Sequence, residues 1–432
     1  MKGRHEYFLF VSHGSFMKKF KPELLAPAGD MERLKAAVKY GADAVYLGGT
    51  LFGMRTAPSN FDEKQLLEAV EFCHGKNVKV YLTCNVLPRN NDIELLPSFL
   101  ENAQKSGVDA LIISDIGTFE YAKKYAPDVE IHVSTQSGIV NYATANAFYN
   151  MGAKRIVTAR ELSMEEIAGI RKNIPDDMDI ECFIHGAMCV SFSGRCLISN
   201  YLVGRDSNKG DCAQPCRWKY HLMEETRPGV YFPLFEDENG TYIFNSKDMC
   251  MIEHIPELVK AGITSFKIEG RAKSEYYVSV VTNAYRQAID GYINNPSDDY
   301  KPEQWIIDEM RKVSYSDYCT GFYYHTPKQD GNISYKGGYN REWDVVAVVE
   351  KTEDGVAYCV QRNRFFNGDE LEVMPVGKAP YKIKVTQLKN EKGEDIEATN
   401  HPLMKFSFVC DSEIEEGAIL RKEREEDKRV II

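Results

Sequence analysis

Residues 23–47 read ELLAPAGDMERLKAAVKYGADAVYL, and this stretch decides the fold. Two short apolar runs, Glu23–Ala26 and Ala44–Leu47, flank the segment Met31–Tyr40, in which apolar residues recur three and four positions apart as in a helix. Neither run alternates between apolar and polar residues, which is typical of parallel strands that helices cover. The stretch therefore predicts a strand, a helix and a second, parallel strand.

The same alternation of strands and helices continues to about residue 293. It contains nine strand candidates: Glu23–Ala26, Ala44–Leu47, Val78–Cys84, Ala110–Ser114, Glu130–Ser134, Arg155–Thr158, Asp179–Ile184, Tyr242–Asn245 and Ser265–Glu269. Because about eight such units close a TIM-like barrel, one candidate is wrong or lies outside the ring. The alternative is an open doubly wound sheet, but its Gly-rich phosphate turn is replaced here by APAGD.

From about Trp343 the sequence changes character, since alternating strand-like segments are separated by the turns EDG, NGD and EKGED. This pattern predicts a small all-β barrel. The predicted domains are a flexible N-terminal extension at 1–20, the TIM-like barrel at 21–293, a connecting segment at 294–342 and the C-terminal β-barrel at 343–425.

The composition indicates an ordinary globular protein, because 43% of the 432 residues are hydrophobic and 27% are charged. The net charge of −11 argues against non-specific coating of nucleic acid or anionic membrane, although a local basic groove for one RNA is compatible with it. No apolar run is long enough to span a bilayer, and no secretory signal is recognisable. We therefore expect a cytoplasmic protein whose 11 cysteines are reduced.

Five of those cysteines fall between residues 189 and 250, in a segment rich in Gly, Ser and Asn. Several thiolates on a backbone that is free to wrap around them predict a metal centre. An iron–sulfur cluster is the first interpretation, zinc the second and a redox dithiol the third. We expect Cys189, Cys196 and Cys212 to be ligands, and either Cys250 or Cys216 to be the fourth, with Cys250 slightly favoured.

Active sites of such barrels lie at the carboxyl ends of the strands. The residues at the predicted strand ends are Asn85, Asp115, Gln136, Arg160, Glu161, His185, Asn245, Lys247, Asp248, Lys267, Glu269 and Arg271. Among them, Asn245 and Lys247 are predicted to bind the cofactor, together with Arg195 beside Cys196. A buried anionic cluster needs hydrogen-bond donors nearby, and Arg195, Arg205, Arg217, Lys219 and the backbone N–H groups around Gly194 could supply them.

Lys267, Glu269 and Arg271 alternate along the last strand, so their side chains should point the same way. Two cations flanking a carboxylate could bind a dicarboxylate, and Arg271 would then bind one of its carboxylate groups through two hydrogen bonds. A structural ion-pair layer inside the barrel is an equal alternative. His185 is a candidate proton donor or cluster partner, or else a core histidine. For Glu181, at the start of an apolar strand, a structural salt bridge is the favoured interpretation.

The segment around the first cysteines resembles the signature of the peptidase U-32 family, E-x-F-x-x-G-[AS]-x-C-x(4)-G-x-C-x-x-S. The matching residues are Glu181, Phe183, Gly186, Ala187, Cys189, Gly194, Cys196 and Ser199. Further matches are ELLAPAGD, GADAVYLGG, RDSNKGDCAQPCRW, NSKDMC and FKIEGR, which occur in family order over nearly the whole chain.

The resemblance implies a prephenate-dependent tRNA hydroxylation protein that converts a wobble uridine to 5-hydroxyuridine, since the family's peptidase name is historical. It also implies a 4Fe–4S cluster on the matching cysteines, prephenate as co-substrate, and tRNA and a sister protein of the same family as partners. A metal-dependent peptidase and a non-catalytic iron–sulfur partner protein are the alternatives. The peptidase is disfavoured because the sequence contains neither H-E-x-x-H nor G-x-S-x-G.

Overall fold

A computed structural model of the chain divides into two compact units, which we describe separately. The first unit is Met1–Pro302 with Ser316–Tyr339, and the second is Glu303–Tyr315 with Asn340–Ile432. The predicted extension at 1–20 lies outside the residues that the structure describes. The described residues are 21–54, 60–189, 196–207, 210–213, 215, 235–237, 240–242, 247–324, 340–411 and 413–424.

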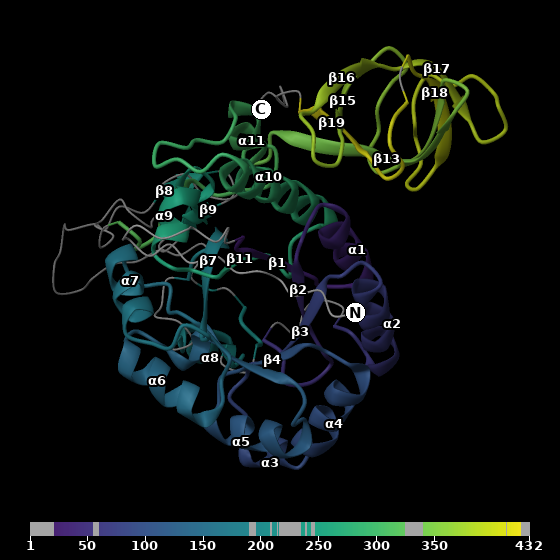
Figure 1. The fold of residues 1–432 in the computed structure, drawn as a ribbon. Coiled ribbons are helices and arrows are strands. Elements are labelled where there is room, and N and C mark those ends of the chain that lie inside the picture. Colours follow the sequence, from purple (N-terminus) through teal and green to yellow (C-terminus); the bar gives the residue numbers. More distant parts are fainter. Residues whose placement is uncertain are drawn as a thin grey trace, which may run out of the picture. The chain divides into compact units, whose positions relative to one another are not determined.

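The first unit is a closed barrel of parallel strands, as Figure 1 shows. The ring runs in sequence order from β1 to β7, and β11 pairs in parallel with both β7 and β1 to close it. The predicted TIM-like barrel is therefore confirmed, and the open doubly wound alternative is wrong. The strands are β1 Glu23–Pro27, β2 Ala44–Gly48, β3 Lys79–Cys84, β4 Ala110–Ile113, β5 Glu130–Val133, β6 Arg155–Val157, β7 Asp179–Ala187 and β11 Ser265–Ile268.

Helices surround the ring in Figure 1, and their apolar residues, such as Leu66 and Val70 of α2, are buried. In α1, Asp30 accepts a hydrogen bond from the Arg33 N–H at the start of the helix, and Leu34 and Ala37 are buried. None of the helices in the described ranges combines the length and the hydrophobicity that a membrane span requires. The helices of this unit are α1 Met31–Lys39, α2 Glu63–His74, α3 Asn90–Ile93, α4 Leu96–Ser106, α5 Ile116–Tyr125, α6 Tyr142–Met151, α7 Met164–Lys172, α8 Ile198–Val203, α9 Ile255–Lys260 and α10 Glu275–Asn294.

The surplus strand candidate is Tyr242–Asn245, which is wrong as a barrel strand. Tyr242 ends β9 (Gly240–Tyr242), which pairs with β8 (Phe235–Asp237) in a separate antiparallel hairpin, and residues 243–246 lie outside the described ranges. Instead, β10 (Asp248–Cys250) pairs antiparallel with the carboxyl end of β7, and β12 (Tyr318–Cys319) continues the sheet beyond it. β7 can carry this extension because it is nine residues long and outreaches its neighbours in the ring.

The second unit is an antiparallel sheet curved into a half-barrel, so the predicted all-β C-terminal domain is confirmed. Its strand order is β16-β15-β19-β13-β14-β18-β17, and its core contains Phe365, Leu371 and Leu420. The helix α11 (Gln304–Glu309) belongs to this unit, so the segment predicted as a connection is divided between the two units. The strands are β13 Trp343–Glu353, β14 Val356–Gln361, β15 Glu370–Met374, β16 Tyr381–Lys384, β17 Thr386–Asn390, β18 Lys405–Val409 and β19 Ile419–Glu423.

A buried ion cluster attaches α11 to this sheet. The Arg421 side chain is fully buried, and its guanidinium lies 2.5 Å from carboxylate oxygens of both Glu309 and Glu372. Lys312 adds a second cation, 2.7 Å from Glu372. Because ions that are removed from water need partners, the loss of Arg421 would leave two carboxylates in a buried site with one cation.

We therefore expect Arg421→Met to lower the free energy of unfolding of the second unit by about 3–5 kcal/mol. Differential scanning calorimetry of the full chain would measure this as a lower transition temperature. The control is Arg424→Met, because Arg424 forms a partly exposed ion pair with Asp344 at 2.9 Å, and such pairs contribute about 1 kcal/mol or less. Equal effects of the two substitutions would contradict the structural role assigned to Arg421.

Candidate active site

A pocket of about 580 Å³, which includes space open to solvent, lies at the carboxyl ends of the barrel strands. The predicted strand-end residues that line it are Asn85, Gln136, Arg160, Lys267, Glu269 and Arg271. The other lining residues are Tyr46, Met54, Thr83, Ile112, Ser134, Thr135, Val157 and Phe183. Strand ends that are far apart in sequence therefore contribute one polar pocket, as the barrel geometry predicts.

Lys267 lies at the bottom of this pocket in an almost fully buried position. Its Nζ is 2.6 Å from the Glu181 carboxylate and lies over the ring faces of Tyr46 and Phe183, at 4.4 and 5.4 Å from their centroids. Burial lowers the pKa of Lys267, the Arg155 and Arg160 cations lower it further, and Glu181 acts in the opposite direction. Lys267 is thus both an ion-pair partner and a cation of the pocket.

Arg271 is held by the loop and strand around it. Its guanidinium donates to Thr83 Oγ1 at 2.9 Å and to the Met54 carbonyl, and the side chain is 2% exposed. A Cβ at Gly48 would lie 2.3 Å from the Arg271 Nη1, so any larger residue at this strand end would displace the guanidinium. Lys267, Glu269 and Arg271 all line the one pocket, as their alternation predicts.

Glu269 is fixed through its backbone. Its N–H donates to the His185 carbonyl at 2.9 Å, and its own carbonyl accepts from Tyr277 Oη at 3.0 Å. Gly186 allows this close approach, because it has a φ of +108° and a Cβ there would lie 2.6 Å from the Glu269 carbonyl oxygen. A bulge between Lys267 and Ile268 accompanies it in the β7–β11 pairing.

Arg160 follows β6 and reaches across the pocket wall. Its guanidinium lies 3.8 Å from the centroid of the Phe183 ring, and its Nη1 donates to the Ala187 carbonyl at 2.8 Å. Ala187 ends β7, two residues before Cys189. Arg160 therefore joins the pocket to the start of the cysteine segment.

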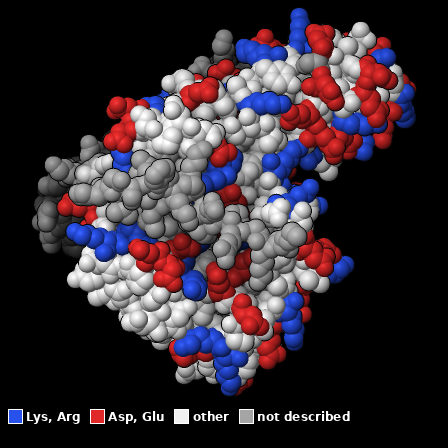
Figure 2. All heavy atoms as spheres, viewed as in Figure 1, with Lys and Arg blue, Asp and Glu red and all other residues white. Residues whose placement is uncertain are grey.

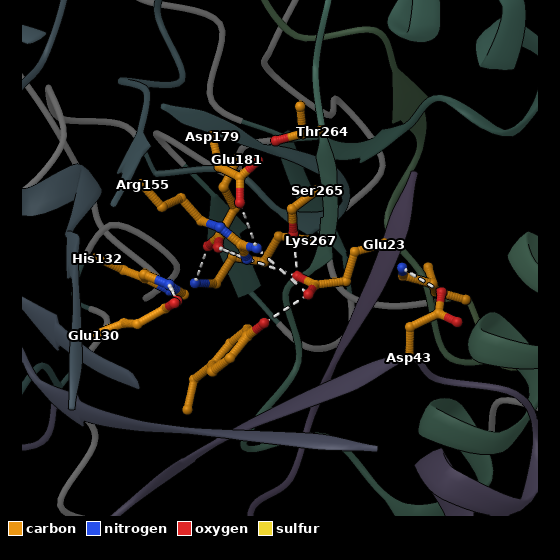
Figure 3. Close-up of polar contacts among 12 residues, drawn as sticks. Glu23, Asp43, Glu130, His132, Arg155, Asp179, Glu181, Thr264, Ser265 and Lys267 are labelled. Atoms are coloured by element: carbon orange, nitrogen blue, oxygen red, sulfur yellow. Dashed lines mark hydrogen bonds and ion pairs between the residues drawn. The ribbon is translucent and has the colours of Figure 1, made fainter. Parts of the chain in front are cut away.

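Below the pocket, the barrel interior contains a network of buried charges. Figure 3 shows Glu23, Arg155, Glu181 and Lys267 pointing toward one another from different strands. Arg155 lies 2.6 Å from Glu23, 3.2 Å from Glu181 and 3.3 Å from Asp179. The predicted salt bridge of Glu181 is confirmed, and Glu181 connects this network to Lys267.

The network favours ionised carboxylates. Burial alone would raise the pKa of Glu23, but the Arg155 cation and hydrogen bonds from Arg155, Tyr81 and Ser265 outweigh it and lower the pKa to about 2. Burial also opposes ionisation of Glu181, and there the Lys267 and Arg155 cations lower the pKa. Both carboxylates are therefore negatively charged at neutral pH.

His185 does not line the pocket. Its imidazole packs against the rings of Tyr277, Tyr285 and Tyr318, and its Nδ1 lies 3.4 Å from Tyr285 Oη. Burial, assisted by the Lys273 cation, lowers the pKa of His185 to about 3. The imidazole is therefore neutral at pH 7. A role as proton donor stays a prediction, and these contacts are those of a core histidine.

The described cysteines of the predicted metal centre are Cys189, Cys196, Cys212 and Cys250. In the part of the chain that the structure describes, no three His, Cys, Asp or Glu side chains gather closely enough to hold a metal ion. The described residues therefore do not by themselves make up a four-thiolate site. The ligand set stays a prediction.

The segment that carries Cys196 and Cys212 is nevertheless fixed to the barrel. Asp206 forms an ion pair at 2.7 Å with Arg89, in the loop after β3. Ser207 Oγ donates to the Cys196 carbonyl at 2.6 Å, and Ser199 Oγ accepts from the N–H of Ala213, the neighbour of Cys212, at 3.0 Å. The segment thus folds on itself near the carboxyl ends of the strands.

Among the remaining predictions, Arg195, Asn245 and Cys216 lie outside the described residues. Lys247 is half-buried, directly precedes β10, and is not among the residues that line the pocket. Their roles as cofactor-binding and metal-binding residues stay predictions.

Sequence reasoning missed the contribution of Arg155 to the network. Arg155 begins the short apolar run RIVT, which was predicted to be a buried barrel strand. A buried arginine needs a carboxylate partner, so this position could have indicated an ion pair inside the barrel. It also assigned no role to Tyr46 and Thr83, which lie near strand ends and support Lys267 and Arg271.

A closed β/α barrel with a polar, cationic pocket at the carboxyl ends of its strands is the architecture of an enzyme of the TIM-barrel class. Residues 29–333 of the chain match Peptidase family U32, and residues 341–421 match the Peptidase family U32 C-terminal domain. The chain belongs to Peptidase family U32.

Relatives are similar over nearly the whole length. The chain is 36% identical over 404 residues to tRNA hydroxylation protein P1 of Bacillus subtilis, and the match covers 93% of this chain and 95% of that protein. It is 35% identical over 419 residues to tRNA hydroxylation protein P of Escherichia coli, covering 87% and 90%. It is also 35% identical over 364 residues to a protein named Collagenase from Porphyromonas gingivalis, covering 81% and 86%.

The charge network predicts a pH-dependent stability. Because folding lowers the pKa of Glu23 from 4.5 to about 2, the stabilisation is fully present above pH 4.5 and is lost as the pH falls toward 2. We expect Glu23→Gln to lower the free energy of unfolding at pH 7 by about 3 kcal/mol, and by less at pH 3.5. Urea unfolding at both pH values would measure this difference.

The control for this prediction is Glu120→Gln, since Glu120 is an exposed residue of α5 whose ion pair with Lys123 spans 3.3 Å on the surface. It should change the free energy of unfolding by less than about 1 kcal/mol at either pH. A Glu23→Gln effect that is the same at pH 7 and pH 3.5 would contradict the lowered pKa.

Proposed function

We propose that this chain hydroxylates tRNA, converting a wobble uridine to 5-hydroxyuridine. The observation that carries the proposal is the match to tRNA hydroxylation protein P1, which covers 93% of this chain and 95% of that protein. A relative that is similar over both domains is a better guide than the fold alone, because one barrel fold hosts many chemistries.

The small-acid co-substrate of this reaction, prephenate, is proposed to bind in the barrel pocket. Three cations line the pocket, namely Lys267, Arg271 and Arg160, and Glu269 is the one carboxylate among its described lining residues. Three cations against one carboxylate in the described lining favour a dicarboxylate over a neutral ligand. Glu269 lines the pocket beside these cations and is proposed to exchange a proton with the bound acid.

An iron–sulfur cluster is proposed as the cofactor, held by Cys189, Cys196, Cys212 and either Cys250 or Cys216. When bound, a cluster of this kind supplies electron transfer or a site for substrate coordination. The contribution of the chain is to hold the thiols near the pocket. The contact of Arg160 with Ala187 and the fixed segment around Asp206 support this placement.

An RNA substrate would have to bind by local contacts. Figure 2 shows acidic and basic side chains interspersed over the visible face, consistent with the net charge of −11. Electrostatic attraction over the whole molecule therefore does not supply the affinity for RNA. Recognition would depend on the fit of one nucleotide and its neighbours near the barrel mouth, and a tRNA substrate agrees with the predicted cytoplasmic location.

The relative named Collagenase makes a peptidase the second candidate function. The described lining of the pocket contains Ser134 but neither histidine nor cysteine. A serine or cysteine nucleophile with a histidine base, one of the common arrangements for peptide hydrolysis, is therefore missing from this lining. This lining argues against a serine or cysteine peptidase, and the similarity to tRNA hydroxylation protein P1 favours hydroxylation over a metal-dependent peptidase.

Deletion of the gene should remove 5-hydroxyuridine from tRNA, and mass spectrometry of digested nucleosides would detect its loss. Complementation with Glu269→Gln should restore less than a tenth of the wild-type level, because a positioned acid–base group typically contributes about 100-fold or more to a rate. Complementation with Glu120→Gln should restore it fully. Unchanged 5-hydroxyuridine in the deletion strain would remove the tRNA assignment.

Protein purified without oxygen should be brown and should contain about four irons per chain. Cys196→Ser should lower the iron content by at least half, because a lost thiolate weakens the cluster. Cys359→Ala is the matched control, since Cys359 is buried in the second unit. A colourless protein that contains zinc, and cleaves gelatin in a chelator-sensitive manner, would favour the peptidase instead.

A further inference from the structure

The cations of the pocket differ in how far the protein already uses their hydrogen-bond donors. Lys267 is paired with Glu181 at 2.6 Å and is 5% exposed. Arg271 is 2% exposed, and its two terminal nitrogens donate to Thr83 and to the Met54 carbonyl. These two side chains create a positive potential in the pocket, but their positions are set by protein partners.

Arg160 is different. It is only half-buried, and of its five N–H donors one, on Nη1, has an acceptor among the described residues, the Ala187 carbonyl at 2.8 Å. The Phe183 ring, 3.8 Å away, fixes the plane of the guanidinium. A fixed planar fork with unused donors, facing a pocket, is the geometry that binds a carboxylate through two parallel hydrogen bonds.

Two neutral amides of the same pocket complete a donor set. Asn85 Oδ1 accepts from the Met54 N–H at 3.0 Å, and this contact leaves the Asn85 amide nitrogen as a donor. Gln136 lies on the short turn Thr135–Ser137 after β5, and its side-chain amide is partly exposed in the lining. Asn85 and Gln136 can therefore bind the carbonyl or hydroxyl oxygens of a small acid.

We propose that Arg160 is the residue that binds a carboxylate of the small-acid ligand, with Asn85 and Gln136 binding its neutral oxygens. Lys267 and Arg271 then act as fixed positive charges rather than as the direct clamp. This inference rests on the proposed function for the class of ligand, a small dicarboxylate such as prephenate. It adds Arg160, Asn85 and Gln136 as the residues that determine specificity.

Isothermal titration calorimetry of prephenate into the full-length protein tests the assignment. Arg160→Gln should weaken binding by about 10- to 100-fold, because it removes charge-assisted hydrogen bonds to the carboxylate. Arg160→Lys should bind with intermediate affinity, since a lysine keeps the charge but loses the fork. The matched control is Arg364→Gln, because Arg364 of the second unit is an exposed arginine whose guanidinium lies 4.8 Å from the Phe366 ring centroid. It should leave the affinity unchanged.

Wild-type affinity in Arg160→Gln and Arg160→Lys would overturn the assignment. So would the absence of prephenate binding to the wild-type protein. In that second case, loss of 5-hydroxyuridine in the deletion strain would still support the tRNA function, so the two proposals fail separately. Thermal unfolding of each variant confirms folding, and Arg160→Lys carries the test if Arg160→Gln does not fold.

Discussion

The buried ion network inside the barrel is the constraint on which the rest of the structure depends. Arg155 from β6 lies among Glu23 from β1 and Asp179 and Glu181 from β7, while Lys267 from β11 pairs with Glu181. These strands are the ones that meet where the ring closes. Loss of Arg155 would leave Glu23 and Glu181 without the cation that they share away from water, so the network favours the closed barrel over looser pairings.

The same network forms the base of the pocket. Lys267 belongs to both, because its ammonium is paired with Glu181 on one side and lines the pocket between Tyr46 and Phe183 on the other. Of the two interpretations that were equal at the level of sequence, the ion-pair layer is seen in the pairing of Lys267 with Glu181, and the dicarboxylate site stays a prediction. The ion pair with Glu181 fixes the Lys267 ammonium at the pocket, where its positive charge acts on the pocket electrostatically without a direct contact.

The alignments with the two relatives named for tRNA hydroxylation and with the one named Collagenase each cover more than four-fifths of this chain. The barrel and the half-barrel do not distinguish between these activities, because function depends on the groups at the site. The described pocket offers cations, amides and one carboxylate, which suits the binding of a small acid, and it contains no nucleophile–histidine pair. The chemistry of the described lining, rather than the fold, therefore argues against a serine or cysteine peptidase.

Periodicity and strand ends were enough to predict the barrel, the β-rich second domain and the shared orientation of Lys267, Glu269 and Arg271, because these depend on short-range patterns. Tyr242–Asn245 was wrongly included, since a short apolar run has the same pattern in a barrel strand and in a hairpin. Tertiary structure alone decided that Arg155 pairs with Glu23, 132 residues away, and that Arg160 stacks on Phe183. Such contacts depend on which strands become neighbours when the ring closes. A local sequence pattern does not specify which residues far apart in the chain will meet.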